Sequence, residues 1–95
     1  MAEVEQQQRR EVYYSGRVQG VGFRYTARAI AARFAVSGCV RNLPDGRVHL
    51  VVEGEADEIK MFLQAVQDEM RHYVSSAEET AGQAGGRFQG FEIKH

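Results

Sequence analysis

Two glycines and an arginine lie close together near the start of this 95-residue chain, in the segment GRVQGVGFR (residues 16–24). Gly20 and Gly22 let the backbone fold tightly, so that successive N–H groups can converge on one bound anion. A helical pattern begins at Phe23, and the free N–H groups and dipole of a helix N-terminus attract negative charge. Arg24, in the first turn, adds a planar guanidinium suited to phosphate or carboxylate oxygens. The segment therefore predicts a phosphate-binding site.

Two familiar phosphate-binding motifs do not fit this segment. A Walker loop would end in Gly-Lys-Ser or Gly-Lys-Thr, and a dinucleotide-binding fingerprint would need a small residue where Tyr25 stands. The pattern thus disfavours a nucleoside triphosphatase and a Rossmann enzyme. Glycines after a strand also often serve only a tight turn, and composition by itself leaves that alternative open.

Asn42 is the second candidate for chemistry, and it stands directly before the turn sequence Leu-Pro-Asp-Gly (residues 43–46). An asparagine in this place commonly opens a turn by hydrogen-bonding to its own backbone. In the fold expected here, however, its strand passes near the end of the first strand, so the carboxamide could reach the glycine loop. A carboxamide can hold a water and an anion together, but it cannot take up a proton. We expect Asn42 to orient a ligand rather than to act as a base.

The elements that would position these residues follow from the apolar periodicity. Alternation over residues 11–18 predicts a strand, and a helical stripe begins at Phe23. Residues 39–42 and 47–53 flank the turn as a hairpin. A second helix follows Gly54, with the apolar stripe Ile59, Phe62, Leu63, Val66 and Met70. Phe91 and Ile93 alternate in a short last strand.

This order, strand, helix, strand, strand, helix, strand, predicts an α+β ferredoxin-like sandwich (βαββαβ). We expect an antiparallel sheet with two helices packed on one face. Residues 71–87 are polar and glycine-rich, so they are typical of a loop, and the limits of the fourth strand stay open.

The two predicted helices differ in the charge of their first turns. Glu55, Asp57 and Glu58 crowd the start of the second helix and offset its dipole, whereas the first helix begins Phe-Arg-Tyr-Thr-Ala without an acid. The N-terminus of the first helix is therefore left for an external anion.

Size and composition limit the classes of function. The length fits one small domain, and a net charge of −1 gives no basic field for a nucleic acid. A lone cysteine, no secretory N-terminus and no apolar run long enough to span a bilayer indicate the reduced cytoplasm and no membrane. Residues 1–10 lack an apolar pattern and are expected to form a mobile tail before a domain of residues 11–95.

The remaining reactive side chains show no catalytic spacing. His49, His72 and His95 are scattered, without the arrangement that a metal site or a triad needs, so we expect them to be solvated. Cys39, beside a glycine in a strand, is more typical of packing than of a nucleophile. The sequence predicts neither a metal nor a cofactor.

Two segments together resemble the acylphosphatase family, over roughly residues 11–95. GRVQGVGFR matches its first signature, and GCVRNLPDGRVHLVVEG (residues 38–54) matches its second. The resemblance implies that a small acyl phosphate is hydrolysed to a carboxylate and inorganic phosphate without metal or cofactor. We expect phosphate to bind as product or inhibitor and the chain to be a monomer, although the sequence itself does not reveal the oligomeric state. By position, Arg24 and the backbone of the loop would bind the phosphoryl group, and Asn42 would position the attacking water. The loop residues are Gln19, Gly20, Val21, Gly22 and Phe23.

The chain departs from the family pattern at two places. Position 39 is usually aromatic and is Cys39 here, which removes bulk and is expected to loosen the core under the hairpin. Residues 75–86 are also less strand-like than the family pattern.

Two other functions compete. One is a recognition module on the same fold, like the acylphosphatase-like domains fused to hydrogenase maturation proteins. The presence of both Arg24 and Asn42 favours turnover, because a phosphate binder has no need to arrange water. The other is RNA recognition, which would want exposed aromatics and a basic face, and neither is apparent.

Overall fold

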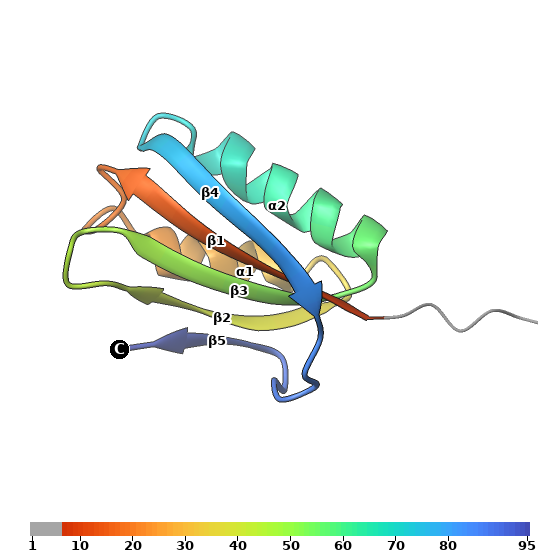
Figure 1. Ribbon diagram of the computed structural model, residues 1–95. Helices are drawn as coiled ribbons and strands as arrows, with labels where there is room; N and C mark the ends of the chain where they lie inside the picture. Colours follow the sequence, from red (N-terminus) through yellow and green to blue (C-terminus); the bar gives the residue numbers. More distant parts are fainter. Residues whose placement is uncertain (1–6) are drawn as a thin grey trace, which may run out of the picture.

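The computed structural model describes residues 7–95, and in this part of the chain five strands and two helices form one α+β sandwich (Figure 1). The strands form one sheet in the order β4-β1-β3-β2-β5, and both helices cover the same face of it. The ferredoxin-like fold predicted from the sequence is confirmed. The elements are β1 (Gln8–Gly16), α1 (Phe23–Ala31), β2 (Val36–Asn42), β3 (Val48–Gly54), α2 (Ala56–Met70), β4 (Val74–Gln83) and β5 (Phe91–Lys94).

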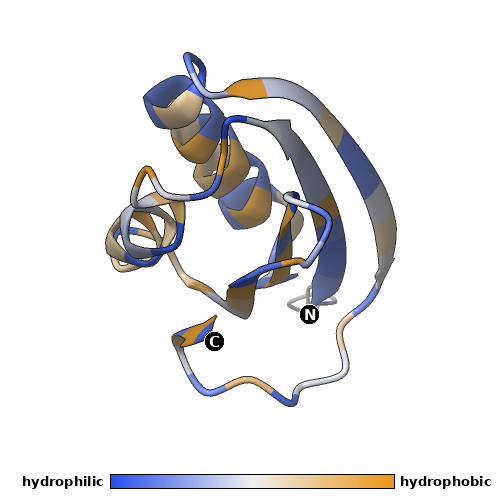
Figure 2. Ribbon diagram, turned by 90° about the vertical axis from the view of Figure 1, so that its left-hand side faces the viewer, coloured by the Kyte–Doolittle hydropathy of each residue, from blue (hydrophilic) through white to orange (hydrophobic). Residues whose placement is uncertain are grey.

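The sheet is mixed rather than wholly antiparallel, because β5 pairs in parallel with β2, from Gly38 opposite Phe91 to Arg41 opposite Lys94. The other pairings, β1 with β3, β1 with β4 and β2 with β3, are antiparallel. In this arrangement β4 runs opposite to β2, so one reversal of the chain gives β5 the direction of β2. The reversing segment lies on the side of the sheet away from the helices (Figure 2).

The first strand starts earlier than the sequence indicated. β1 begins at Gln8, so that residues 8–10, expected in the tail, pair with β3. Arg9 forms an ion pair with Glu11 at 3.3 Å, and Arg10 forms one with Glu79 at 3.3 Å. These polar contacts carry no apolar periodicity, which explains the missed start. The rest of the predicted tail, residues 1–6, lies outside the described residues.

The polar segment after α2 is a strand, where the sequence was more typical of a loop. β4 spans ten residues and pairs with β1 along its whole length, although nearly all of its side chains are exposed. As an edge strand it is held by backbone hydrogen bonds to one neighbour, and only Val74 at its start packs against the core. Apolar alternation, the sequence signal for a strand, is therefore missing.

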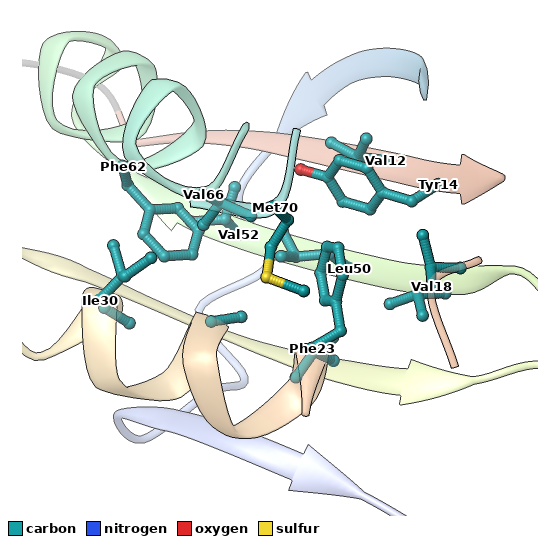
Figure 3. Packing of buried hydrophobic residues seen from close by; sticks show 14 of the residues in the cluster. Val12, Tyr14, Val18, Phe23, Ile30, Leu50, Val52, Phe62, Val66 and Met70 are labelled. Carbon is teal, nitrogen blue, oxygen red and sulfur yellow. The ribbon is translucent and has the colours of Figure 1, made fainter. Parts of the chain in front are cut away.

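The core lies between the sheet and the two helices (Figure 3). Leu50 and Val52 of β3 face Ile30 of α1 and Phe62 of α2 across it, and all four are buried. The alternation of β3 and the stripe of α2 produce this layer as predicted. No helix of residues 7–95 combines the length and the apolar character needed to cross a bilayer.

The same core fixes both ends of the loop between β1 and α1. Val18 is fully buried, and Phe23, the first residue of α1, packs its ring 4.9 Å from that of Tyr14 in β1. Val21, in the middle of the loop, packs against the edge of the same cluster. A flexible-looking glycine loop is thus held on the protein at three points.

Candidate active site

The loop of residues 17–22 turns the chain from β1 into α1 and depends on two left-handed glycines. Gly20 has φ 77° and Gly22 has φ 78°, and a side chain at either position would meet no protein atom within 4 Å. Glycine is therefore needed for the backbone conformation, which other residues adopt only with strain. Gly22 is also the N-cap of α1, and its carbonyl accepts the first helical hydrogen bond, from Thr26 N–H at 3.0 Å.

This loop and the first turn of α1 offer free hydrogen-bond donors. Within residues 7–95, no protein acceptor is found for the N–H groups of residues 20–25. The first turn of α1 has no acidic residue, whereas that of α2 contains Asp57 and Glu58. The contrast predicted between the two helices is present, and it leaves the start of α1 favourable to an anion.

A pocket of about 220 Å³ opens at this helix start. It brings together five of the predicted site residues, among them Arg24 and Asn42, which lie on different elements. Gln19 and Val21 are not part of its wall. The lining residues are Val18, Gly20, Gly22, Phe23, Arg24, Tyr25 and Asn42.

Arg24 supplies the only charge on the wall of this pocket, within the part of the chain that the structure describes. Its Nη1 donates a hydrogen bond to the carbonyl oxygen of Lys94 at 3.1 Å and lies 3.4 Å from Nδ1 of His95. The strand β5 thus orients the guanidinium. Because a guanidinium has five N–H donors, the others stay available to a ligand.

Asn42 is the last residue of β2, opposite Val48 of β3, and is half-buried. In the described structure its carboxamide has no hydrogen bond to protein, so it does not bond to its own backbone. The side chain that bonds locally in the turn is that of Asp45, which accepts hydrogen bonds from Arg47 N–H at 3.0 Å and from Arg47 Nε at 2.8 Å. These bonds lower the pKa of Asp45, with the backbone N–H as the main cause. Asn42 therefore keeps its donors and its acceptor for the pocket.

Gln19 faces the hairpin rather than the pocket. Its Nε2 donates to the carbonyl oxygens of Leu43, at 2.8 Å, and of Arg47, at 2.9 Å. Nothing in the sequence indicated these contacts, because 24 and 28 residues separate the partners. Tyr25 and Val18 also line the pocket, and only their position beside the glycine segment could have suggested it.

The expectation that the histidines are solvated is wrong for His49. This residue is only 6% exposed, on the face of the sheet away from the helices, and its ring stacks on Tyr13 with centroids 4.5 Å apart. Its Nε2 lies 2.9 Å from Oε1 of Glu11, and this hydrogen bond is the main cause that lowers the pKa of Glu11. The pairing of β1 with β3 brings these residues together. His72 and His95 are exposed, as expected.

Cys39 is buried, and burial raises the pKa of its thiol, which agrees with a packing role. It lies opposite Val51, on the sheet face away from the helices and outside the main core cluster. The expected loosening of the core under the hairpin therefore does not follow. Among residues 7–95, no three His, Cys, Asp or Glu side chains are grouped so that they could hold a metal ion.

Comparison with known proteins places this chain in a family. The sequence model of the acylphosphatase family matches residues 10–93. An acylphosphatase of Rubrobacter xylanophilus is 44% identical over 95 residues, covering 99% of this chain and 86% of that protein. The crystal structure of acylphosphatase from Bacillus subtilis matches with a TM-score of 0.83 and 29% identity, covering 93% of this chain and 99% of that one. HypF from T. kodakarensis matches with a TM-score of 0.79 and 27% identity, but over only 12% of its own length.

The fold and the pocket define a small α+β domain whose loop amides and arginine suit a compact anion. The chain belongs to the acylphosphatase family. The same matches assign it acylphosphatase activity, with small acyl phosphates as substrates.

Proposed function

We propose that the protein hydrolyses the carboxyl-phosphate bond of acyl phosphates in the pocket beside α1. Arg24 and the backbone N–H groups of the loop bind the phosphoryl group, and Asn42 positions the attacking water. The loop groups are those of Gln19, Gly20, Val21, Gly22 and Phe23. The observation that supports this most is that one pocket collects Arg24, the glycine loop and an unpaired Asn42 carboxamide.

The chemistry asks little of the protein beyond placement and charge. The water oxygen forms a bond to phosphorus while the bond from phosphorus to the acyl oxygen breaks, and the carboxylate leaves with that electron pair. The water proton passes to a phosphoryl oxygen, because neither Asn42 nor Arg24 can accept it. Since a carboxylate is a good leaving group, no strong protein base is required.

Arg24 and the loop amides stabilise the charge on the equatorial oxygens of the phosphoryl group. Among residues 7–95, no acidic side chain lines the pocket to oppose them. The contact with Lys94 orients the guanidinium before substrate binds, so less conformational entropy is lost on binding.

We also propose that the protein acts as a monomer in the cytoplasm and needs neither metal nor cofactor. The cytoplasmic assignment rests on a single cysteine in the sequence. The metal-free assignment rests on the chemistry above, which needs no Lewis acid beyond the guanidinium and the amides.

One alternative is that the domain recognises a phosphate without turnover, since a similar domain makes up only 12% of the larger protein HypF from T. kodakarensis. Asn42 favours hydrolysis over recognition alone, because only hydrolysis needs a carboxamide that holds a water beside the bound phosphate.

The test measures phosphate release from benzoyl phosphate and acetyl phosphate by the purified chain, with EDTA present. We expect turnover well above the spontaneous rate. Arg24→Ala should raise KM and lower kcat, whereas Asn42→Ala should mainly lower kcat. Arg33→Ala removes an equal charge from an exposed site outside the pocket and serves as the control. Hydrolysis at the spontaneous rate, together with retained phosphate binding, would favour the recognition module.

A further inference from the structure

The side chain of Gln19 joins the phosphate-binding loop to the hairpin that carries Asn42. Its Nε2 group has two hydrogens, and the two bonds to Leu43 O and Arg47 O match that number. Leu43 follows Asn42 directly in the chain. The amide thus spans the gap between the two halves of the site.

The two acceptors of Gln19 are the carbonyls that also close the hairpin turn. Arg47 O accepts a hydrogen bond from Leu43 N–H at 2.8 Å, and Leu43 O accepts one from Gly46 N–H at 3.1 Å. Hydrogen bonds from Gln19 to these oxygens therefore form only when the turn has its present conformation. Any movement of the end of β2 relative to the loop must break or bend these bonds.

Gln19 adds a connection at the site itself, where the loop and the turn are otherwise anchored to different parts of the protein. The loop is anchored to the core through Val18, Val21 and Phe23, and Asn42 is anchored through the pairing of β2 with β3. No other side-chain hydrogen bond within residues 7–95 joins the loop of residues 17–22 to the hairpin turn of residues 43–47. β1 pairs with β3 as far as Tyr14 opposite Val48, and beyond that point the carboxamide of Gln19 supplies the side-chain hydrogen bonds between the loop and the turn.

We propose that Gln19 is a positioning residue that sets the distance between the bound phosphoryl group and the water held by Asn42. This inference rests on the proposed function and adds to it, because the family resemblance gives Gln19 only a backbone role in phosphate binding. In-line attack is sensitive to placement, and a displacement of about 1 Å can cost on the order of a hundred-fold in rate.

The first test replaces Gln19 by Met, which keeps the length and removes both donors. We expect kcat for benzoyl phosphate to fall about ten- to a hundred-fold, while the inhibition constant of inorganic phosphate changes less than about three-fold. Hydrogen exchange of the Leu43 and Gly46 amides, whose hydrogen bonds close the turn, should become faster, and that of β1 and β3 should not. Gln67→Met, at an exposed position of α2, is the matched control and should leave all three quantities unchanged.

The second test, Gln19→Glu, separates positioning from stability. An ionised carboxylate has no donor for two carbonyl oxygens, whereas the protonated acid can donate to one of them. Facing these carbonyls, the carboxyl should have a raised pKa. The kcat of Gln19→Glu relative to wild type should therefore rise severalfold from pH 8 to pH 5.

Three results would decide the matter. If Gln19→Met keeps the wild-type kcat and the wild-type hydrogen exchange of Leu43 and Gly46, the inference is wrong. If both variants lose activity only in proportion to their unfolding, with no pH-dependent ratio for Gln19→Glu, the side chain serves stability alone and the inference is also wrong. If the wild type hydrolyses no acyl phosphate but Gln19→Met still speeds the exchange of Leu43 and Gly46 selectively, the proposed function fails and the connecting role of Gln19 stands.

Discussion

Replacing Asn42 by Asp gives a sharp prediction, because it puts a charge into the pocket with almost no change of shape. The pocket has a volume of about 220 Å³, so a carboxylate on its wall would lie roughly 5 Å from a phosphate at its centre. At an effective dielectric constant of about 20, two like charges at ~5 Å repel by about 3 kcal/mol. That energy corresponds to roughly a hundred-fold weaker phosphate binding.

The assay is competitive inhibition by inorganic phosphate at pH 7.5, measured for wild type, Asn42→Asp and Asn42→Ala. Asn42→Ala removes the same hydrogen bonds without adding charge, and its inhibition constant should stay within about three-fold of wild type. Inorganic phosphate should inhibit Asn42→Asp roughly a hundred-fold more weakly than it inhibits the wild type. Equal inhibition constants for the two variants would mean that Asn42 does not face the bound anion, and its assigned role would be refuted.

Three further substitutions test the fold that supports the site. Because the hydrogen bond to His49 lowers the pKa of Glu11, its stabilisation is present above the unfolded pKa of about 4.3 and is lost as the pH falls through the lower folded value. Urea unfolding should therefore show Glu11→Gln less stable by about 1 kcal/mol at pH 7, and a gap that persists at pH 2 would contradict this. Phe62→Ala leaves a cavity at a fully buried position whose ring lies 5.4 Å from that of Phe91. We expect the free energy of unfolding to fall by about 3–5 kcal/mol in the same assay. A fall of less than about 1 kcal/mol would show that the core is described wrongly. Gly22→Ala puts a residue with a side chain at φ 78°. Thermal unfolding should show a stability loss of about 1–2 kcal/mol, together with lower activity. Stability equal to that of the wild type would mean that the left-handed conformation is not required.

The parts of the fold that bury one apolar face were predictable from sequence. The alternation of Val48, Leu50 and Val52 and the stripe of α2 both have a period that matches their structure, because each element contacts the core on one side only. β4 has no such face, since it is an exposed edge held by backbone hydrogen bonds to β1. Backbone pairing leaves no periodic mark in a sequence, so the limits of this strand could not be predicted.

The candidate site was predictable where residue type itself carries the chemistry. Gly20, Gly22 and Arg24 are close in sequence, and their conformation and charge follow from what they are. The meeting of Asn42 with them could be argued only through the expected topology. The contact of Gln19 with the hairpin and that of His49 with Glu11 join residues 24 to 38 positions apart, and they depend on exact placement of side chains. Contacts of this kind can be identified only from a three-dimensional structure.

The most direct measurement of the central claim is a titration of the ¹⁵N-labelled protein with inorganic phosphate, followed by NMR. Binding in the pocket predicts the largest saturable shifts at the backbone amides of residues 19–23 and at the guanidinium Nε of Arg24, with smaller shifts at the carboxamide of Asn42. Little should change in β4 or in the exposed half of α2. Saturable shifts centred elsewhere, or none in residues 19–24, would contradict the assignment of this loop as the phosphoryl-binding site.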